Sequence, residues 1–183
     1  MLLQRLFAAR PGQDAGRALY DAAARQARRP EFYLALGAPD TVEGRFELYS
    51  LHVALLLIRL KGQGQIAAAT AQALFDVYVR ALDDALRELG VSDVKVGRNM
   101  KKLGEAFYGR LKAHEDAISR LPDDGQLLDL LGRTALEGRT GPDVQALAAY
   151  VAKAASDLAG QGLDGLLEGR VAWPDLRMEQ AHG

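Results

Sequence analysis

Three histidines are the residues of this sequence best suited to proton transfer or metal binding, and their spacing argues against a shared site. His52, His114 and His182 lie far apart along the chain, and no two of them form a His-x3-His pair on one helix face. The chain contains no cysteine, which excludes thiol catalysis, disulfide bonds and thiolate metal centres. No serine lies in a Gly-x-Ser-x-Gly elbow, and no Asp-x-x-Asp motif of a metal-dependent enzyme acting on polyprenyl lipids occurs. We therefore expect no catalytic residue, no metal and no cofactor, and a protein that is not an enzyme.

His52 has the most informative surroundings of the three histidines. It lies between Leu51 and Val53 in the most apolar stretch of the chain, so its simplest interpretation is a core histidine satisfied by a hydrogen bond. The rival interpretation is a contact with haem or with a protein partner, because one histidine on an apolar helix is the least that haem ligation requires. The sequence leaves both interpretations open.

A strongly basic segment runs from Lys95 to Lys112. It carries six cations and one acid, a local charge of +5 in a chain whose net charge is -1. At helical spacing Arg98, Lys101 and Lys102 fall close together on one face, while the apolar residues of the segment supply the inward face. This pattern fits a solvated helix face, and it also fits a surface that binds RNA or an acidic protein.

Length and composition indicate one globular domain. The chain has 183 residues, of which 49% are hydrophobic and 26% charged, so disordered and fibrous classes are disfavoured. The longest strictly apolar run, residues 53–58, has six residues, far fewer than the roughly 20 that a membrane-spanning helix needs. Charge changes along the chain, from +4 over residues 1–30 to +1 over 31–112 and -6 over 113–183. A nucleic-acid partner would therefore have to be bound by a local patch.

The first ten residues form a short amphipathic pattern. Leu2, Leu3, Leu6 and Phe7 share one helical face. The charges lie within or after these apolar residues and no long apolar core follows, so we predict no secretory signal. The segment is interpreted either as a stub that packs on the domain or frays, or as a segment that binds a membrane surface or a partner.

Helical periodicity extends over almost the whole sequence, and the alternation typical of strands does not occur. Residues 45–61 are apolar nearly all round, which predicts a central, buried helix that ends before Gly62. We expect an all-α fold, a single compact domain of about seven helices. The predicted ranges are 12–29, 31–36 (a short turn or helix), 45–61, 65–89, 97–121, 126–136 and 143–159, with one more turn at 163–167.

Three short motifs on these predicted helices carry a family resemblance. They are Leu51-His52-Val53, the run Arg87-Glu88-x-Gly90-Val91 with Asp93, and the stretch from Met100-Lys101-Lys102 to Phe107-Tyr108-Gly109-Arg110. Over residues 30–170 the chain resembles the ubiquinol-cytochrome c chaperone family. We therefore expect an amphipathic and basic helical segment at 1–29, a chaperone-like helical domain at 30–170 and a tail at 171–183. Mitochondrial members carry a targeting presequence; we expect none in this chain, and therefore a bacterial member of the family.

The resemblance implies a non-enzymatic assembly chaperone that binds newly made cytochrome b and assists assembly of the cytochrome bc1 complex, respiratory complex III. It suggests the ribosome near the tunnel exit and a small partner protein as further partners, with no small-molecule substrate. It also implies a cytoplasmic protein, peripheral at the inner face of the cytoplasmic membrane. Capture of such a client protein fits a groove between helices with aromatic and aliphatic lining.

The candidate partner-binding residues are Tyr49, His52, Arg98, Lys101, Lys102, Phe107, Tyr108 and Arg110. The exposed cations are the better candidates, because the apolar members have packing reasons to be present. The alternative function is a helical RNA- or ribosome-binding translational regulator that uses the basic helix 95–112, with affinity that falls steeply as salt rises.

Overall fold

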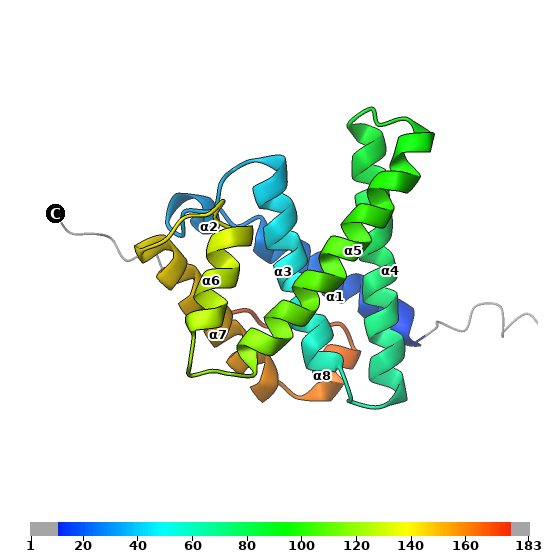
Figure 1. Ribbon diagram of the computed structural model, residues 1–183. Helices are drawn as coiled ribbons and strands as arrows, with labels where there is room; N and C mark the ends of the chain where they lie inside the picture. The colour runs from blue at the N-terminus through cyan, green and yellow to red at the C-terminus, as the bar shows by residue number, and fades with distance from the viewer. Residues whose placement is uncertain (1–10, 177–183) are drawn as a thin grey trace, which may run out of the picture.

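The structure is a computed structural model that describes residues 11–176 of the chain. These residues form helices joined by loops (Figure 1). The helices in this range are α1 (Pro11–Ala27), α2 (Glu31–Leu34), α3 (Val42–Leu60), α4 (Gln65–Glu88), α5 (Asp93–Ile118), α6 (Gly125–Thr134), α7 (Pro142–Gly160) and α8 (Leu163–Leu167). Two of them are very short, since α2 has four residues and α8 has five. The predicted all-α fold is confirmed. No helix in the described range is long and apolar enough to cross a membrane.

Two parts of the sequence analysis concern segments beyond this range. The amphipathic pattern of Leu2, Leu3, Leu6 and Phe7 lies outside the described residues. The same holds for His182 and for the last seven residues of the predicted tail, 177–183.

α3 is the central helix, as its apolar sequence predicts. The Thr41 side chain accepts a hydrogen bond from the backbone N–H of Gly44 at 3.0 Å. This cap starts the helix at Val42, three residues before the predicted start at Arg45. The buried residues of α3 continue along most of its length, and α1, α4, α5 and α7 pack around it. α3 therefore provides the fixed frame to which the other helices attach.

α1 and α4 cross at close range because glycines of α1 face α4. A Cβ atom on Gly16 would lie 2.6 Å from the Cβ of Ala73 and 2.6 Å from the backbone nitrogen of Leu74. A Cβ atom on Gly12 would lie 3.1 Å from the backbone carbonyl carbon of Ala69. The two backbones can approach this closely because glycine carries no side chain. α1 consequently packs against the same body as α3 and α4.

α4 and α5 form a long helical hairpin whose tip projects beyond the neighbouring helices (Figure 1). The turn contains Gly90, whose φ of +76° suits glycine. Arg87, near the end of α4, donates a hydrogen bond to Asp93, the first residue of α5, and this ion pair ties the tip together. α5 thus begins four residues before the predicted start at Gly97. The last buried side chain of α4 is Tyr78, so the outer part of the hairpin lies beyond the core.

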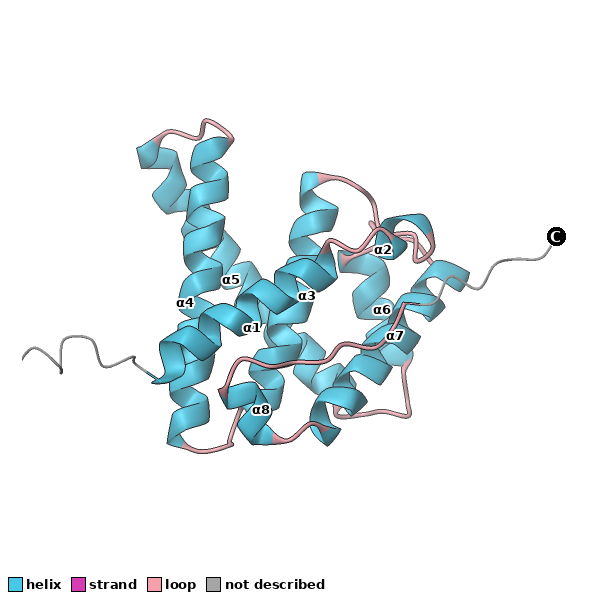
Figure 2. Cartoon of the chain, turned by 180° about the vertical axis from the view of Figure 1, so that it is seen from behind, coloured by secondary structure: helices cyan, strands magenta, loops and turns pink. Residues whose placement is uncertain are grey.

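Residues 170–176, here called the C-terminal strap, follow α8 and run back along α7 without regular secondary structure (Figure 2). Gln161 holds the strap through two hydrogen bonds with the backbone of Ala172. Its Oε1 accepts from the Ala172 N–H at 2.8 Å, and its Nε2 donates to the Ala172 carbonyl at 2.9 Å. The strap brings Trp173 into contact with α3, where its ring meets His52.

Candidate functional site

His52 lies in the core, and both of its ring nitrogens are hydrogen-bonded. Its Nδ1 is 2.7 Å from the carbonyl oxygen of Leu48, and its Nε2 is 2.8 Å from the hydroxyl oxygen of Tyr150. Because a carbonyl oxygen only accepts, Nδ1 carries the proton and Nε2 accepts from the Tyr150 hydroxyl. That hydroxyl in turn accepts from the amide of Gln26 at 3.1 Å. The network joins α3 to α1 and α7. Burial lowers the pKa of His52 to about 4, so its ring is neutral at pH 7.

Aromatic rings complete the surroundings of His52. The ring of Phe32 lies edge-on at 5.3 Å between centroids, and the ring of Trp173 lies edge-on at 5.0 Å. The His52 side chain is completely buried. Of the two interpretations of this histidine, the structure shows the packed core group, and neither haem nor a partner can contact the ring in this conformation.

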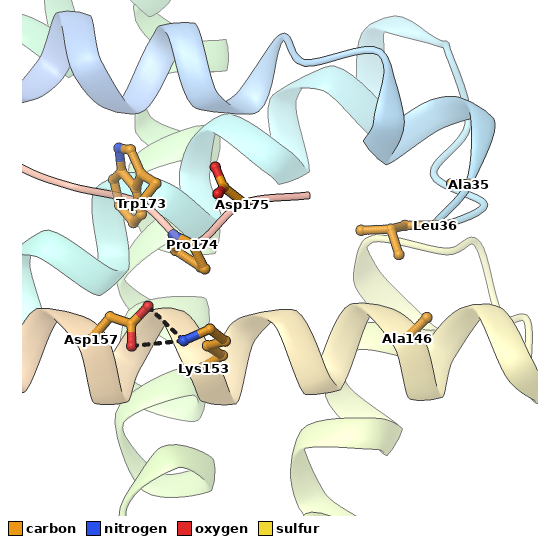
Figure 3. A pocket seen from close by; sticks show the side chains of 8 residues that line it. All are labelled: Ala35, Leu36, Ala146, Lys153, Asp157, Trp173, Pro174 and Asp175. Atoms are coloured by element: carbon orange, nitrogen blue, oxygen red, sulfur yellow. Dashed lines mark hydrogen bonds and ion pairs between the residues drawn. The ribbon is translucent and has the colours of Figure 1, made fainter. Parts of the chain in front are cut away.

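A cleft of about 810 Å³ lies between the C-terminal strap and α7 (Figure 3). Trp173 and Pro174 stand on the strap side, and Lys153 and Asp157 project from α7. The Lys153 ammonium group donates to both carboxylate oxygens of Asp157 at 3.0 Å. This ion pair is satisfied within α7.

An apolar groove of about 870 Å³ opens between the first half of α3 and the outer part of the α4–α5 hairpin. We call it the hairpin groove. Its α3 wall contains the apolar and aromatic side chains of Val42, Phe46 and Tyr49 beside three charged ones, and α2 adds Tyr33 and Leu34 at one end. Its α4 wall is a stripe of apolar side chains at helical spacing: Ala81, Leu82, Ala85, Leu86 and Leu89.

The rim of the hairpin groove is exposed and hydrophobic. Leu34 is 75% exposed, Val42 61% and Leu89 62%. These are three of the five large hydrophobic side chains that are exposed within residues 11–176. Scattered single apolar residues are ordinary on a protein surface, whereas a set gathered around one concave surface indicates a binding site.

The floor of the groove contains an ion pair. Glu47, which is buried, accepts a hydrogen bond from Nη2 of Arg110 on α5. The Arg110 guanidinium also lies 5.9 Å from the centre of the Phe46 ring. Burial raises the pKa of Glu47, and the positive charge of Arg110 partly offsets this effect. At the rim, Arg45 pairs with Asp40 at 2.7 Å. The charged groups of the groove are therefore largely matched with each other.

The structure distributes the eight predicted partner-binding residues over three places. Two of them are buried in the core: His52 and Phe107. Two belong to the hairpin groove, one in its α3 wall and one beneath its floor: Tyr49 and Arg110. Four are exposed on α5: Arg98, Lys101, Lys102 and Tyr108. Of the eight, Tyr49 is the residue that lines a concave surface.

The exposed cations of α5 form a surface of their own, here called the basic face (Lys95, Arg98, Lys101 and Lys102). Lys101 lies 4.0 Å from Glu105. The other three cations of the basic face have no ion-pair partner among residues 11–176. None of the four lines the hairpin groove. Three of the four cations predicted as partner contacts, Arg98, Lys101 and Lys102, are thus separate from the apolar groove, and the fourth, Arg110, lies beneath its floor.

Of the residues that line the groove, Tyr49 alone was predicted as a partner-binding residue. Leu34 falls in the predicted short turn or helix 31–36 and the α4 stripe falls in the predicted helix 65–89, and neither was predicted to bind a partner. The sequence offers no signal that divides this stripe: only the structure shows that the fully buried side chains of α4 end at Tyr78, although the stripe continues to Leu89.

The other described histidine is also buried. His114 on α5 is 3% exposed, and burial, with a further effect from Arg110, lowers its pKa to about 4. Its Nδ1 has no hydrogen-bond partner within the described part of the chain. No group of three or more histidine or acidic side chains placed to hold a metal ion occurs in residues 11–176.

Comparison with known proteins finds relatives over most of the chain. Residues 34–173 match the family described as ubiquinol-cytochrome c chaperone. The mouse and human proteins named ubiquinol-cytochrome c reductase complex assembly factor 1 are each 28% identical over 149 residues. This stretch is 80% of the present chain, 50% of the mouse protein and 49% of the human protein. The chain therefore spans about half the length of these relatives.

A solved structure resembles the whole fold. The crystal structure of the Cbp3 homolog from Brucella abortus is 32% identical in sequence, with a TM-score of 0.85. The match covers 96% of the present chain and 98% of the Brucella chain. The two chains therefore share almost the whole fold, including the packing of α1 against α3 and α4.

Proposed function

The chain belongs to the ubiquinol-cytochrome c chaperone family, and on that premise we propose that it is a non-enzymatic assembly chaperone for newly made cytochrome b. Its relatives carry the name of assembly factors for ubiquinol-cytochrome c reductase. The proposed chaperone holds an apolar part of its client until the cytochrome bc1 complex assembles. It works as a peripheral protein at the inner face of the cytoplasmic membrane.

The hairpin groove is the observation that carries this proposal. A subunit destined for the membrane exposes apolar surface before it is assembled, and such surface is costly in water. The groove, about 870 Å³ in volume, offers a matching apolar surface with hydrophobic side chains along its rim. Tyr49, one of the predicted partner-binding residues, contributes to its wall. Holding a client there needs complementary shape and no bond-making chemistry.

The test is affinity capture of the tagged protein from gently solubilised membranes of its own host, with the bound proteins identified by mass spectrometry. We expect cytochrome b to be enriched, while mature cytochrome c1 and the Rieske protein are not. The variant Leu89→Glu places a charge on the groove rim and should lose the client. The matched control is Ile66→Glu, because both residues lie on α4 and both are 62% exposed.

Two results would contradict the proposal. One is a wild-type capture that contains no cytochrome b. The other is equal cytochrome b capture by wild type and Leu89→Glu, which would place the client elsewhere on the molecule. Circular dichroism of both variants confirms that the comparison is made between folded proteins.

A second candidate function, RNA or ribosome binding, is favoured by the basic face. Three of its cations have no ion-pair partner among residues 11–176, and exposed cations of this kind bind phosphate groups. Joint replacement of Arg98, Lys101 and Lys102 by Glu should abolish RNA binding if this function is correct. It is refuted if the wild-type protein binds no RNA at moderate salt. A capture dominated by ribosomal proteins, without cytochrome b, would favour it over the chaperone.

A further inference from the structure

We infer that the hairpin groove receives an α-helical segment of its partner, about two turns long, which presents an uncharged apolar face. The inference rests on the proposed function, since it specifies the kind of segment that the chaperone holds. Four features of the groove lead to it: the form of its walls, its size, its charge and the hydrogen-bonding needs of a bound backbone.

Both long walls of the groove are helices with apolar stripes at helical spacing. On α4, the small residues Ala81 and Ala85 lie one turn apart, and each is followed by a leucine, Leu82 and Leu86. Alternating small and large side chains create the ridges and grooves into which the side chains of another helix fit. On α3, Val42, Phe46 and Tyr49 repeat at intervals of four and three residues, the spacing of a helix-packing face. The two helices thus leave a position for a third helix between them.

The size of the groove agrees with a short helix. Residues 81–89 of α4 extend over about 12 Å at 1.5 Å per residue, which is slightly more than two turns. A helix 10–12 Å in diameter occupies about 120–170 Å³ per residue. The groove volume of about 870 Å³ therefore accommodates about five to seven residues of such a helix. The wall length corresponds to about eight residues and the volume to about five to seven, so both indicate a segment of about one and a half to two turns.

The charges of the groove balance, which selects against a charged occupant. Its lining together with the residue beneath its floor contains three arginines and three carboxylates: Arg28, Arg45, Arg110, Asp40, Glu43 and Glu47. Arg45 and Asp40 pair with each other, as do Arg110 and Glu47, and Arg28 lies 5.4 Å from the centre of the Tyr49 ring. An RNA, an acidic peptide or an anionic lipid needs clustered uncompensated cations. Such a cluster lies on the basic face outside the groove, whereas Arg28 is the one arginine of this set without a carboxylate partner among residues 11–176. An apolar protein segment complements the neutral groove.

The backbone of the occupant must satisfy its own hydrogen bonds. An extended peptide binds well where it can add to a sheet edge, but residues 11–176 contain no strand. Against these apolar walls, the N–H and C=O groups of an extended segment would remain without partners. A helix pairs these groups internally and turns only its side chains towards the walls.

The test is a fluorescence anisotropy titration of the full-length chain with labelled peptides. The probe is an alanine-rich helical peptide of about 18 residues with leucines at positions i, i+3, i+4 and i+7, long enough to form a helix in water. Its partner peptide has the same composition except for one central proline, which breaks the helix. We expect the helical peptide to bind at least roughly tenfold more tightly than the proline peptide.

Two tryptophan substitutions on α4 locate the site. Ala85→Trp fills the groove and should weaken binding of the helical peptide by at least roughly tenfold. Ala68→Trp is the matched control, because Ala68 is an exposed alanine on the same helix, outside the groove lining. Its affinity should equal that of the wild type. Equal affinity for the two peptides, or undiminished binding by Ala85→Trp, would overturn the inference. Displacement of the peptide by an RNA oligonucleotide or by phosphatidylglycerol vesicles would also overturn it.

The two proposals can fail separately. If Leu89→Glu loses cytochrome b in the membrane capture but the wild type binds no helical peptide, the chaperone function stands and the helical occupant is refuted. If the helical peptide binds as expected but cytochrome b is never captured, the groove is a helix-binding site for another protein and the proposed client is wrong.

Discussion

Replacing Gly16 of α1 by Ala should destabilise the protein, although the same change in an open helix stabilises it. The new Cβ atom would lie 2.6 Å from the Cβ of Ala73 and 2.6 Å from the backbone nitrogen of Leu74. Non-bonded carbon atoms attract each other best at about 3.5–4.0 Å, so α1 and α4 would have to separate by about 1 Å. The Leu74 nitrogen belongs to the helix backbone and cannot rotate out of the way.

The size of this effect follows from two opposing terms. Inserting a methylene-sized group into a well-packed contact costs about 1–3 kcal/mol. Replacing glycine by alanine within a helix stabilises the helix by about 0.5–1 kcal/mol. Taken at the middle of each range, about 2 and about 0.75 kcal/mol, the two terms predict that the free energy of unfolding falls by about 1 kcal/mol. For a chain of this length, such a loss lowers Tm by about 2–4 °C.

Gly104 on α5 provides the matched control. A Cβ atom added there would have no neighbour within 4 Å, so the Gly104→Ala variant should gain about 0.5–1 kcal/mol. Thermal and urea unfolding of the three proteins, followed by circular dichroism, measures both changes. If Gly16→Ala is as stable as the wild type or more stable, α1 does not cross α4 as closely as the structure shows, and the reasoning is refuted.

Two further predictions concern the buried histidines and the strap. Stability should fall as pH decreases from 7 to 4, because His52 and His114 have pKa values of about 4 in the fold, whereas the unfolded chain takes up these protons near pH 6.5. The unfolded state then binds more protons than the folded state, and between pH 7 and pH 5 the free energy of unfolding falls by about 2 kcal/mol per histidine. A free energy of unfolding that stays constant over this pH range, measured by urea titration, would contradict this prediction. Replacing Trp173 by Ala should lower the free energy of unfolding by less than the roughly 3–5 kcal/mol of a fully buried tryptophan, because Trp173 is half-buried, and it should raise the His52 pKa in an NMR titration. An unchanged His52 pKa would show that the strap does not cover this ring.

The sequence predicted the helices well because the signals for helices are local. Residues 45–61 are apolar nearly all round, and they form most of the central helix α3. The predicted start of α3 was late because Gly44 was read as part of the loop, although Thr41 supplies a cap to its N–H. The predicted start of α5, at Gly97, is also late, but no side chain caps this helix at Ser92; its first residue, Asp93, is held by the ion pair with Arg87 of α4. The exact first and last residues of a helix depend on single local contacts, which the spacing of apolar residues does not reveal.

The His52 network could be predicted only in part. Its position in the most apolar helix correctly suggested a hydrogen-bonded core histidine. The partners of that histidine could not be named, because Tyr150 lies 98 residues further along the chain, and Gln26 lies 124 residues from Tyr150. No local pattern links residues so far apart, and the strap that adds Trp173 has no regular structure that a periodicity would reveal.

The hairpin groove was not predictable, because a stripe of apolar residues shows that a helix face is covered without showing what covers it. Along α4, the fully buried side chains end at Tyr78 and Leu82 still packs against the core, while the apolar side chains between Ala81 and Leu89 line the groove. The same stripe therefore serves the fold in its first part and the proposed client in its second. This division has a consequence for any series of substitutions along α4. Truncating Leu74, which is completely buried, should reduce stability. A charge at Leu89 should leave stability nearly unchanged and remove binding.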